Sequence, residues 1–130
     1  MRSFLNRHKT LSVFLAFVLS FVVWEMAAPV RGTLAAHFDV ARGRYRLLTY
    51  GLPVPWLPEY ARLLRQKYGI EVKAVAGCVV SSQLTSYVDS YDRVSVAAAS
   101  RKSGHDIFEE CEKEAERNWA LDESVKTPRD

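Results

Sequence analysis

The chain has 130 residues, enough for one domain and little more. Its 48% hydrophobic and 25% charged residues are typical of a globular protein and exclude wholesale disorder. The net charge of +3 lies in residues 1–36, where four basic residues face one acidic residue, while 14 basic and 14 acidic residues cancel in the remainder. That remainder has no global field to attract phosphate, so we expect no nucleic-acid partner.

The first ten residues form a basic N-terminal tail (1–10), and an apolar run follows them. The stretch LSVFLAFVLSFVVW (11–24) carries no charge, and beyond Glu25 the run extends to Ala28. A run of this length approaches the roughly 17–25 residues of a spanning helix, and it is apolar on every face, unlike a buried helix of a soluble protein. We therefore predict a transmembrane or signal-anchor helix over 11–28 that contacts membrane lipid.

The flanking residues indicate processing and orientation. Pro29 directly follows Ala28 and is a poor context for signal peptidase, which favours an uncleaved anchor; a cleaved, secreted form is the alternative. Three basic residues precede the run within ten positions, which favours a single-pass protein with a cytoplasmic N-terminus and an extracytoplasmic domain. The sequence VAGC (75–78) matches a bacterial lipoprotein box, but it lies far behind the apolar run, so we reject it.

Residues 29–43 are predicted to be a linker, with a possible extra strand over LAAHFDV (34–40). A small domain is expected over 44–121. Its first element, RYRLLTYG (44–51), alternates in polarity and should be a strand that Gly51 ends.

The next elements are defined by proline and glycine. Pro53 and Pro55 prevent a helix directly after the strand, whereas Pro58 suits the first turn of one and Gly69 its left-handed end. The alternation of IEVKAVA (70–76) then predicts a second strand. A strand, a helix and a strand within about thirty residues form a βαβ unit, so the strands should be parallel.

Two helices should complete the domain. Helical spacing predicts one helix, or two abutting helices divided near Asp92, over 82–103, begun by Ser81 or Ser82 and ended by Gly104. The apolar positions are Leu84, Tyr87, Val88, Tyr91, Val94 and Ala98. In SGHDIFEEC (103–111), Asp106 and Glu109 have the spacing of a capping box for the last helix, which makes the cluster structural. Residues 122–130 are expected to be a polar tail. The predicted fold class is therefore α/β: a small βαβ unit followed by two helices.

A candidate binding site lies at the carboxyl edge of the two strands, where parallel sheets collect ligands. It would contain Tyr50, Gly51, Trp56, Gly77 and Cys78. Cys78 and His105 are the candidates for a catalytic thiolate and its base, since a helix start near Ser81 would favour a thiolate. The chain has no C-x-x-C pair, no zinc ligand set and no Gly-rich phosphate loop, so we expect no metal or cofactor.

Cys78 also has two non-catalytic interpretations. A cysteine at the end of a buried strand is usually part of the core, so we expect Cys78 to be inaccessible and Cys111 to lie on a buried helix stripe. In an oxidising compartment the two could instead form a disulfide. We favour a membrane-anchored accessory subunit or interaction module, with a protein partner or a homo-oligomer covering the sheet edge. A thiol-dependent enzyme or redox protein that uses Cys78 is the alternative.

Overall fold

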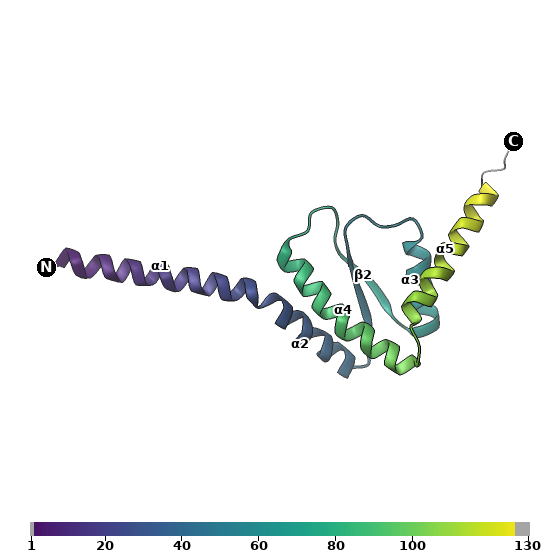
Figure 1. Cartoon of the computed structure of the whole chain (residues 1–130), viewed down its shortest axis with the longest axis horizontal. Coiled ribbons are helices and arrows are strands. Elements are labelled where there is room, and N and C mark those ends of the chain that lie inside the picture. Colours follow the sequence, from purple (N-terminus) through teal and green to yellow (C-terminus); the bar gives the residue numbers. More distant parts are fainter. Residues whose placement is uncertain (1, 127–130) are drawn as a thin grey trace.

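A computed structural model describes the backbone of residues 2–126 and the side chains of residues 11–126. The described chain has an extended N-terminal helix attached to a body in which a two-stranded sheet lies among helices (Figure 1). The elements in chain order are α1 (Arg2–Met26), α2 (Ala28–Ala41), β1 (Arg46–Tyr50), α3 (Leu57–Tyr68), β2 (Glu71–Ala76), α4 (Ser82–Ser103) and α5 (Ile107–Lys126).

The predicted α/β class is wrong, because the described chain is mostly helical, with five helices and two short parallel strands. The strand–helix–strand unit itself is present. Glu71 N–H donates to Tyr45 O at the start of the pair, and α3 connects the two strands. A sheet of only two strands is too small to dominate a fold, so most of the packing is between helices.

The predicted membrane-spanning helix over 11–28 is also wrong as a single continuous helix. Among the described residues, no single helix is long and apolar enough to cross a membrane; Leu11–Met26 and Ala28–Ala41 meet the test only as a pair bent by 45°. Pro29 explains the break, because its ring cannot donate a hydrogen bond and clashes with the carbonyl four residues earlier. Arg31 lies 4.5 Å from the ring of Trp24 across this bend.

The expected linker with a possible strand over residues 34–40 is instead the helix α2, so the strand prediction is wrong. Its buried residues are Ala28, Gly32 and Ala36, which recur every four positions and form one face. This face packs closely on α4: a Cβ on Gly32 would lie 2.3 Å from the carbonyl oxygen of Tyr87. The helix is therefore fixed by tertiary packing.

The core consists of two clusters, both built around α4 and the strands. The first joins α3, α5 and the end of α4 through Tyr60, Leu63, Leu64, Ile70, Ala99, Ile107, Cys111 and Ala115. The second joins α2, β1 and α4 through Ala36, Leu48, Val88 and Tyr91. Burial of Cys111 confirms its predicted place on the inner stripe of α5.

The predicted helix ends are largely confirmed. Pro58 lies in the first turn of α3, and Gly69 and Gly104 end α3 and α4 in left-handed conformations with φ of 68° and 77°. Asp106 Oδ1 accepts hydrogen bonds from Phe108 N–H at 3.1 Å and Glu109 N–H at 3.2 Å, as capping requires. The Glu109 side chain bonds to Lys113 and not back to the Asp106 N–H, so the Glu109 half of the predicted capping box is wrong. Helix α5 extends through much of the expected polar tail to Lys126, and residues 127–130 lie outside the described chain.

Candidate functional site

An open groove of about 590 Å³ lies at the carboxyl end of the two strands. The end of each strand and the loop after β1 form its walls, and most of these side chains are apolar. The lining residues are Thr49, Tyr50, Gly51, Leu52, Pro53, Val54, Leu57, Ala74, Val75, Ala76 and Gly77. The groove thus lies where the topology of parallel strands places a binding site.

The local sequence explains the shape of this groove. Gly51 has a φ of 87°, a conformation that glycine adopts without strain, and it turns the chain away from β1. Pro53 and Pro55 then keep the loop out of a helix until α3 begins at Leu57. The loop therefore stands away from the strands, and its side chains Leu52 and Val54 are exposed beside the groove.

Three of the five residues predicted at this edge line the groove, namely Tyr50, Gly51 and Gly77. Trp56 does not, because its ring packs edge-on against Tyr60 at 5.7 Å and contributes to the first core cluster. Cys78 is also absent from the lining. It is exposed, so the expectation that Cys78 is buried is wrong, and both cysteines are free, which excludes their disulfide in this structure.

The two candidate catalytic residues, Cys78 and His105, lie near opposite ends of one helix. Cys78 precedes α4, whose N-cap is Ser81, and His105 follows the C-terminal cap Gly104. A helix of 22 residues is about 33 Å long. His105 is therefore too far away to act as a base for Cys78. Among the described residues, no group of three or more His, Cys, Asp or Glu side chains could hold a metal ion.

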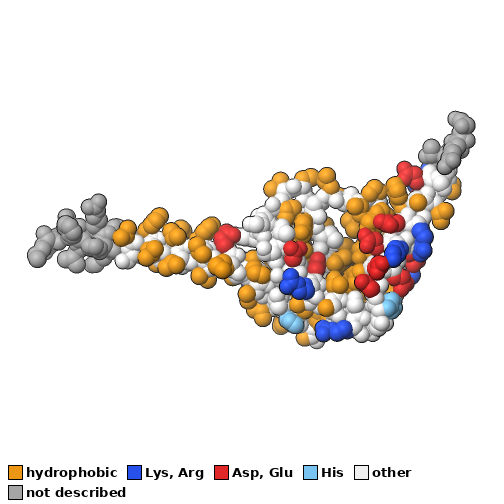
Figure 2. Space-filling view, viewed as in Figure 1, with side chains coloured by type: hydrophobic (Ala, Val, Ile, Leu, Met, Phe, Trp, Pro, Cys, Tyr) orange, Lys and Arg blue, Asp and Glu red, His pale blue; other side chains and the backbone are white. Residues whose placement is uncertain are grey.

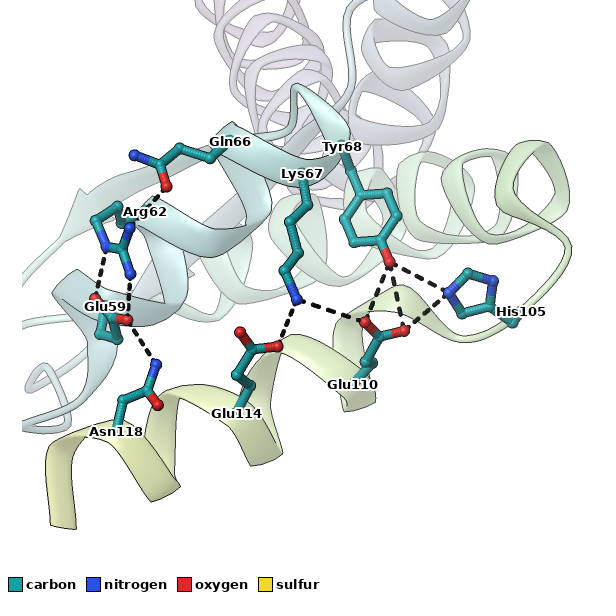
Figure 3. A network of polar contacts seen from close by, with 9 residues as sticks. All are labelled: Glu59, Arg62, Gln66, Lys67, Tyr68, His105, Glu110, Glu114 and Asn118. Atoms are coloured by element: carbon teal, nitrogen blue, oxygen red, sulfur yellow. Dashed lines mark hydrogen bonds and ion pairs between the residues drawn. The ribbon is translucent and has the colours of Figure 1, made fainter. Parts of the chain in front are cut away.

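His105 instead belongs to a polar network between α3 and α5 (Figure 3). Its Nε2 lies 3.0 Å from Glu110 Oε2, and its Nδ1 lies 3.0 Å from the carbonyl oxygen of Ser103. Tyr68 Oη donates to the same Glu110 carboxylate at 3.4 Å. Lys67 adds an ion pair to Glu114, one turn further along α5. These contacts are exposed, and they join the two helices.

The other end of the network is centred on Glu59. Its carboxylate accepts hydrogen bonds from Arg62, at 2.6 Å to Oε1, and from Asn118 of α5 at 2.9 Å. The hydrogen bonds from Arg62 and then from Asn118 lower the pKa of Glu59 to about 2. The network is thus a set of ion pairs and hydrogen bonds that joins α3 to α5 (Figure 3).

Polar side chains of α4 cover the outer edge of β1. Ser95, which is 2% exposed, accepts from Arg46 N–H at 3.1 Å and donates to the Arg46 carbonyl at 2.6 Å. Asp92 Oδ1 accepts from Leu48 N–H at 2.9 Å. Burial raises the pKa of Asp92 to about 6, although the bond from Leu48 opposes that shift. These two side chains take the place of a neighbouring strand.

The outer edge of β2 is different. Glu71 N–H donates to Tyr45 O of the neighbouring strand, so the backbone groups of Val72 and Ala74 point away from β1. Within residues 2–126, nothing from the chain bonds to these outward groups. Lys73 and Ala74 are exposed at this edge. One edge of the sheet is therefore capped and the other is open.

Helix α1 has an exposed apolar surface. Between Leu11 and Met26 the exposed apolar side chains occupy nearly every position, so they cover all sides of the helix, and Phe17 is 72% exposed. In Figure 2 this surface continues along α1 until it reaches the body, interrupted by one acidic side chain. The sequence has one acidic residue between Leu11 and Met26, namely Glu25, close to the bend between α1 and α2.

No protein-family model matches the chain, and comparisons with curated proteins and with solved structures find no match.

Proposed function

We propose that the protein is a membrane-attached accessory subunit or interaction module, in which α1 contacts lipid and the body binds a protein partner. The observation that carries the proposal is the apolar surface of α1, which projects from the body with its side chains exposed (Figures 1 and 2). In water this surface would cost about 25 cal/mol for every Å² exposed. Lipid is the solvent in which that cost disappears.

Lipid suits α1 better than a protein groove does, because the apolar side chains surround the helix. A helix that docks in a groove shows one apolar stripe, whereas α1 has exposed apolar residues at consecutive positions such as Phe21, Val22 and Val23. Trp24 and Arg31 lie together at the bend, and both side chains are suited to a membrane–water interface. The proposed lipid contact therefore covers residues 11–26, with the interface at the bend.

The length of this segment limits how it sits in the bilayer. Residues 11–26 in a helix extend about 24 Å, which is less than the ~30 Å hydrocarbon core. The proposal is therefore lipid insertion of α1 up to the bend, with α2 packed on the body.

Liposome flotation tests this proposal. The full chain is reconstituted with neutral phosphatidylcholine vesicles, so that attraction of the basic tail to anionic lipid does not contribute. Two aspartates in α1, Leu15→Asp with Leu19→Asp, should each cost about 3 kcal/mol in the hydrocarbon, which lowers partitioning more than a thousandfold.

The matched control is Leu121→Asp with Val125→Asp. These α5 residues are also exposed and apolar, at 66% and 78%, but they lie outside the proposed lipid contact. The control should float like the wild type. Flotation of the α1 variant at the wild-type level, or loss of flotation in the control alone, would refute the proposal.

The thiol-dependent alternative has less support. Cys78 is exposed, but it does not line the groove, and α4 separates it from His105. We therefore do not propose an enzymatic activity.

A further inference from the structure

We infer that the open edge of β2 is the partner site, and that it accepts an extended segment of another protein as a third strand. The segment would place an acidic side chain opposite Lys73 and an apolar side chain in the adjoining groove. This deepens the proposed function, because it names the class of partner that the body binds.

The two edges of the sheet differ in how their outward backbone groups are bonded. Ser95 and Asp92 bond to three outward backbone groups of β1, namely the N–H and carbonyl of Arg46 and the N–H of Leu48. The equivalent groups of Val72 and Ala74 have no such cover within the described residues. Two-stranded sheets are marginally stable, and an open edge is a template for pairing with another chain. Strand addition would bond these groups and enlarge the sheet.

The groove supplies side-chain recognition next to this edge. Ala74, Val75 and Ala76 belong both to β2 and to the groove lining, so a strand along β2 passes beside the groove. Leu52 and Val54 of the opposite wall are exposed and apolar. Main-chain bonds would then provide affinity and an apolar side chain in the groove would provide specificity, as strand addition requires.

Charge identifies the segment further. Glu71 is already bound to Arg46 at 2.9 Å. Lys73, in the middle of β2, is exposed and has no ion pair within the described chain. Opposite charges that face each other across strands are favourable, so an acidic residue is the complement of Lys73.

The same charge disfavours a second copy of this chain. Antiparallel pairing that bonds both Val72 and Ala74 to a second β2 would place Lys73 directly opposite the same lysine, which is destabilising. A shifted register with Val72 opposite its own equivalent would put Ala74 opposite Ile70. The Ile70 N–H already donates to the Leu64 carbonyl at 3.1 Å. Pairing with a second copy in this register would therefore break that hydrogen bond.

The test uses the full chain in phosphatidylcholine nanodiscs and a defined peptide. The peptide has seven residues, valine alternating with threonine around a central glutamate, and its controls carry either N-methylated backbone amides or a central lysine. Amide hydrogen exchange reports on Val72 and Ala74. We expect the glutamate peptide to slow exchange at both residues at least tenfold, and the N-methylated peptide to leave it unchanged.

Two variants address the edge directly. Ala74→Pro removes one outward N–H without breaking a bond to β1, and it should weaken peptide binding at least tenfold. Lys73→Glu keeps the backbone donor and should reverse the preference, so that the lysine peptide binds about fivefold more tightly than the glutamate peptide. This second variant keeps the test informative if the proline variant fails to fold.

Unchanged exchange at Val72 and Ala74 with the glutamate peptide, or no change of preference in Lys73→Glu, would overturn the inference. A wild-type dimer that Ala74→Pro dissociates would also overturn it, because the edge would then be covered by a second copy. Flotation of either β2 variant should match the wild type. Failure of the peptide test therefore leaves the lipid contact of α1 untouched, and failure of flotation leaves the peptide test valid.

Discussion

Replacing Gly32 by alanine should destabilise the protein, although the same change in the interior of an isolated helix is stabilising. Alanine normally gains about 1 kcal/mol over glycine there. At Gly32 the new Cβ would lie 2.3 Å from the Tyr87 carbonyl oxygen, 3.1 Å from its carbonyl carbon and 3.3 Å from Ser90 Cβ. The nearest obstacle is backbone of α4, so the helices must move apart.

The size of the effect follows from two opposing terms. Overpacking by one methyl typically costs about 1–3 kcal/mol, and part of this is offset by the gain in helix propensity. Because the 2.3 Å contact is with backbone, which cannot rotate away, we expect an overpacking cost of about 2–3 kcal/mol and a net loss of about 1–2 kcal/mol in the free energy of unfolding. The measurement is urea titration of the full chain in mild detergent, followed by circular dichroism. A variant as stable as the wild type would refute the close packing of α2 on α4.

Gly77→Ala is the control. Gly77 has no heavy atom within 4 Å of its added Cβ, and its φ is not in the left-handed region. The same chemical change should therefore alter stability by no more than about 0.5 kcal/mol.

Three further predictions concern the edge of β1 and the two thiols. Ser95→Ala should cost about 1–3 kcal/mol in urea titration, because it leaves both backbone groups of Arg46 unbonded, whereas the exposed Ser86→Ala should cost little. Burial raises the pKa of Asp92 to about 6 from an ordinary 3.8, so the folded state binds the proton more tightly than the unfolded state does. The contribution of Asp92 to the free energy of unfolding is therefore fully present below about pH 4 and is lost as the pH rises through 6. Asp92→Asn should thus be more stable than the wild type by about 1 kcal/mol at pH 7.5, allowing for partial exposure, and the difference should vanish near pH 4; a pH-independent difference would contradict this. Cys78 should react with iodoacetamide in the native protein, whereas Cys111 should react only on unfolding. Equal alkylation rates for the two thiols would show that Cys111 is not buried.

The sequence predicted the elements that depend on local signals. Alternation over β1 and β2 and the punctuation by Pro58, Gly69 and Gly104 are properties of short stretches. The parallel pairing of the strands followed from the helix between them. The fold class could not be predicted in this way. The two strands were recognised, but local patterns do not show that most of the packing is between helices.

Long-range packing was what the sequence could not predict. Helix α2 is fixed by contact with α4, some fifty positions later, and its face of small residues gave no strong periodic signal. Ser95 and Asp92 resembled the polar side of an exposed helix, and only the pairing of β1 shows that they cap its edge. Trp56 could have been placed in the core from its i,i+4 spacing to Tyr60.

The most direct test of the central proposal is the depth of α1 in a bilayer. With Trp24, Trp56 and Trp119 replaced by phenylalanine, Phe17→Trp places a single fluorophore on the exposed surface of α1. In phosphatidylcholine vesicles we predict strong quenching by lipids brominated in the acyl chain and little quenching by aqueous iodide. Efficient quenching by iodide, with no effect of brominated lipid, would contradict the lipid contact of α1 and with it the proposed membrane attachment.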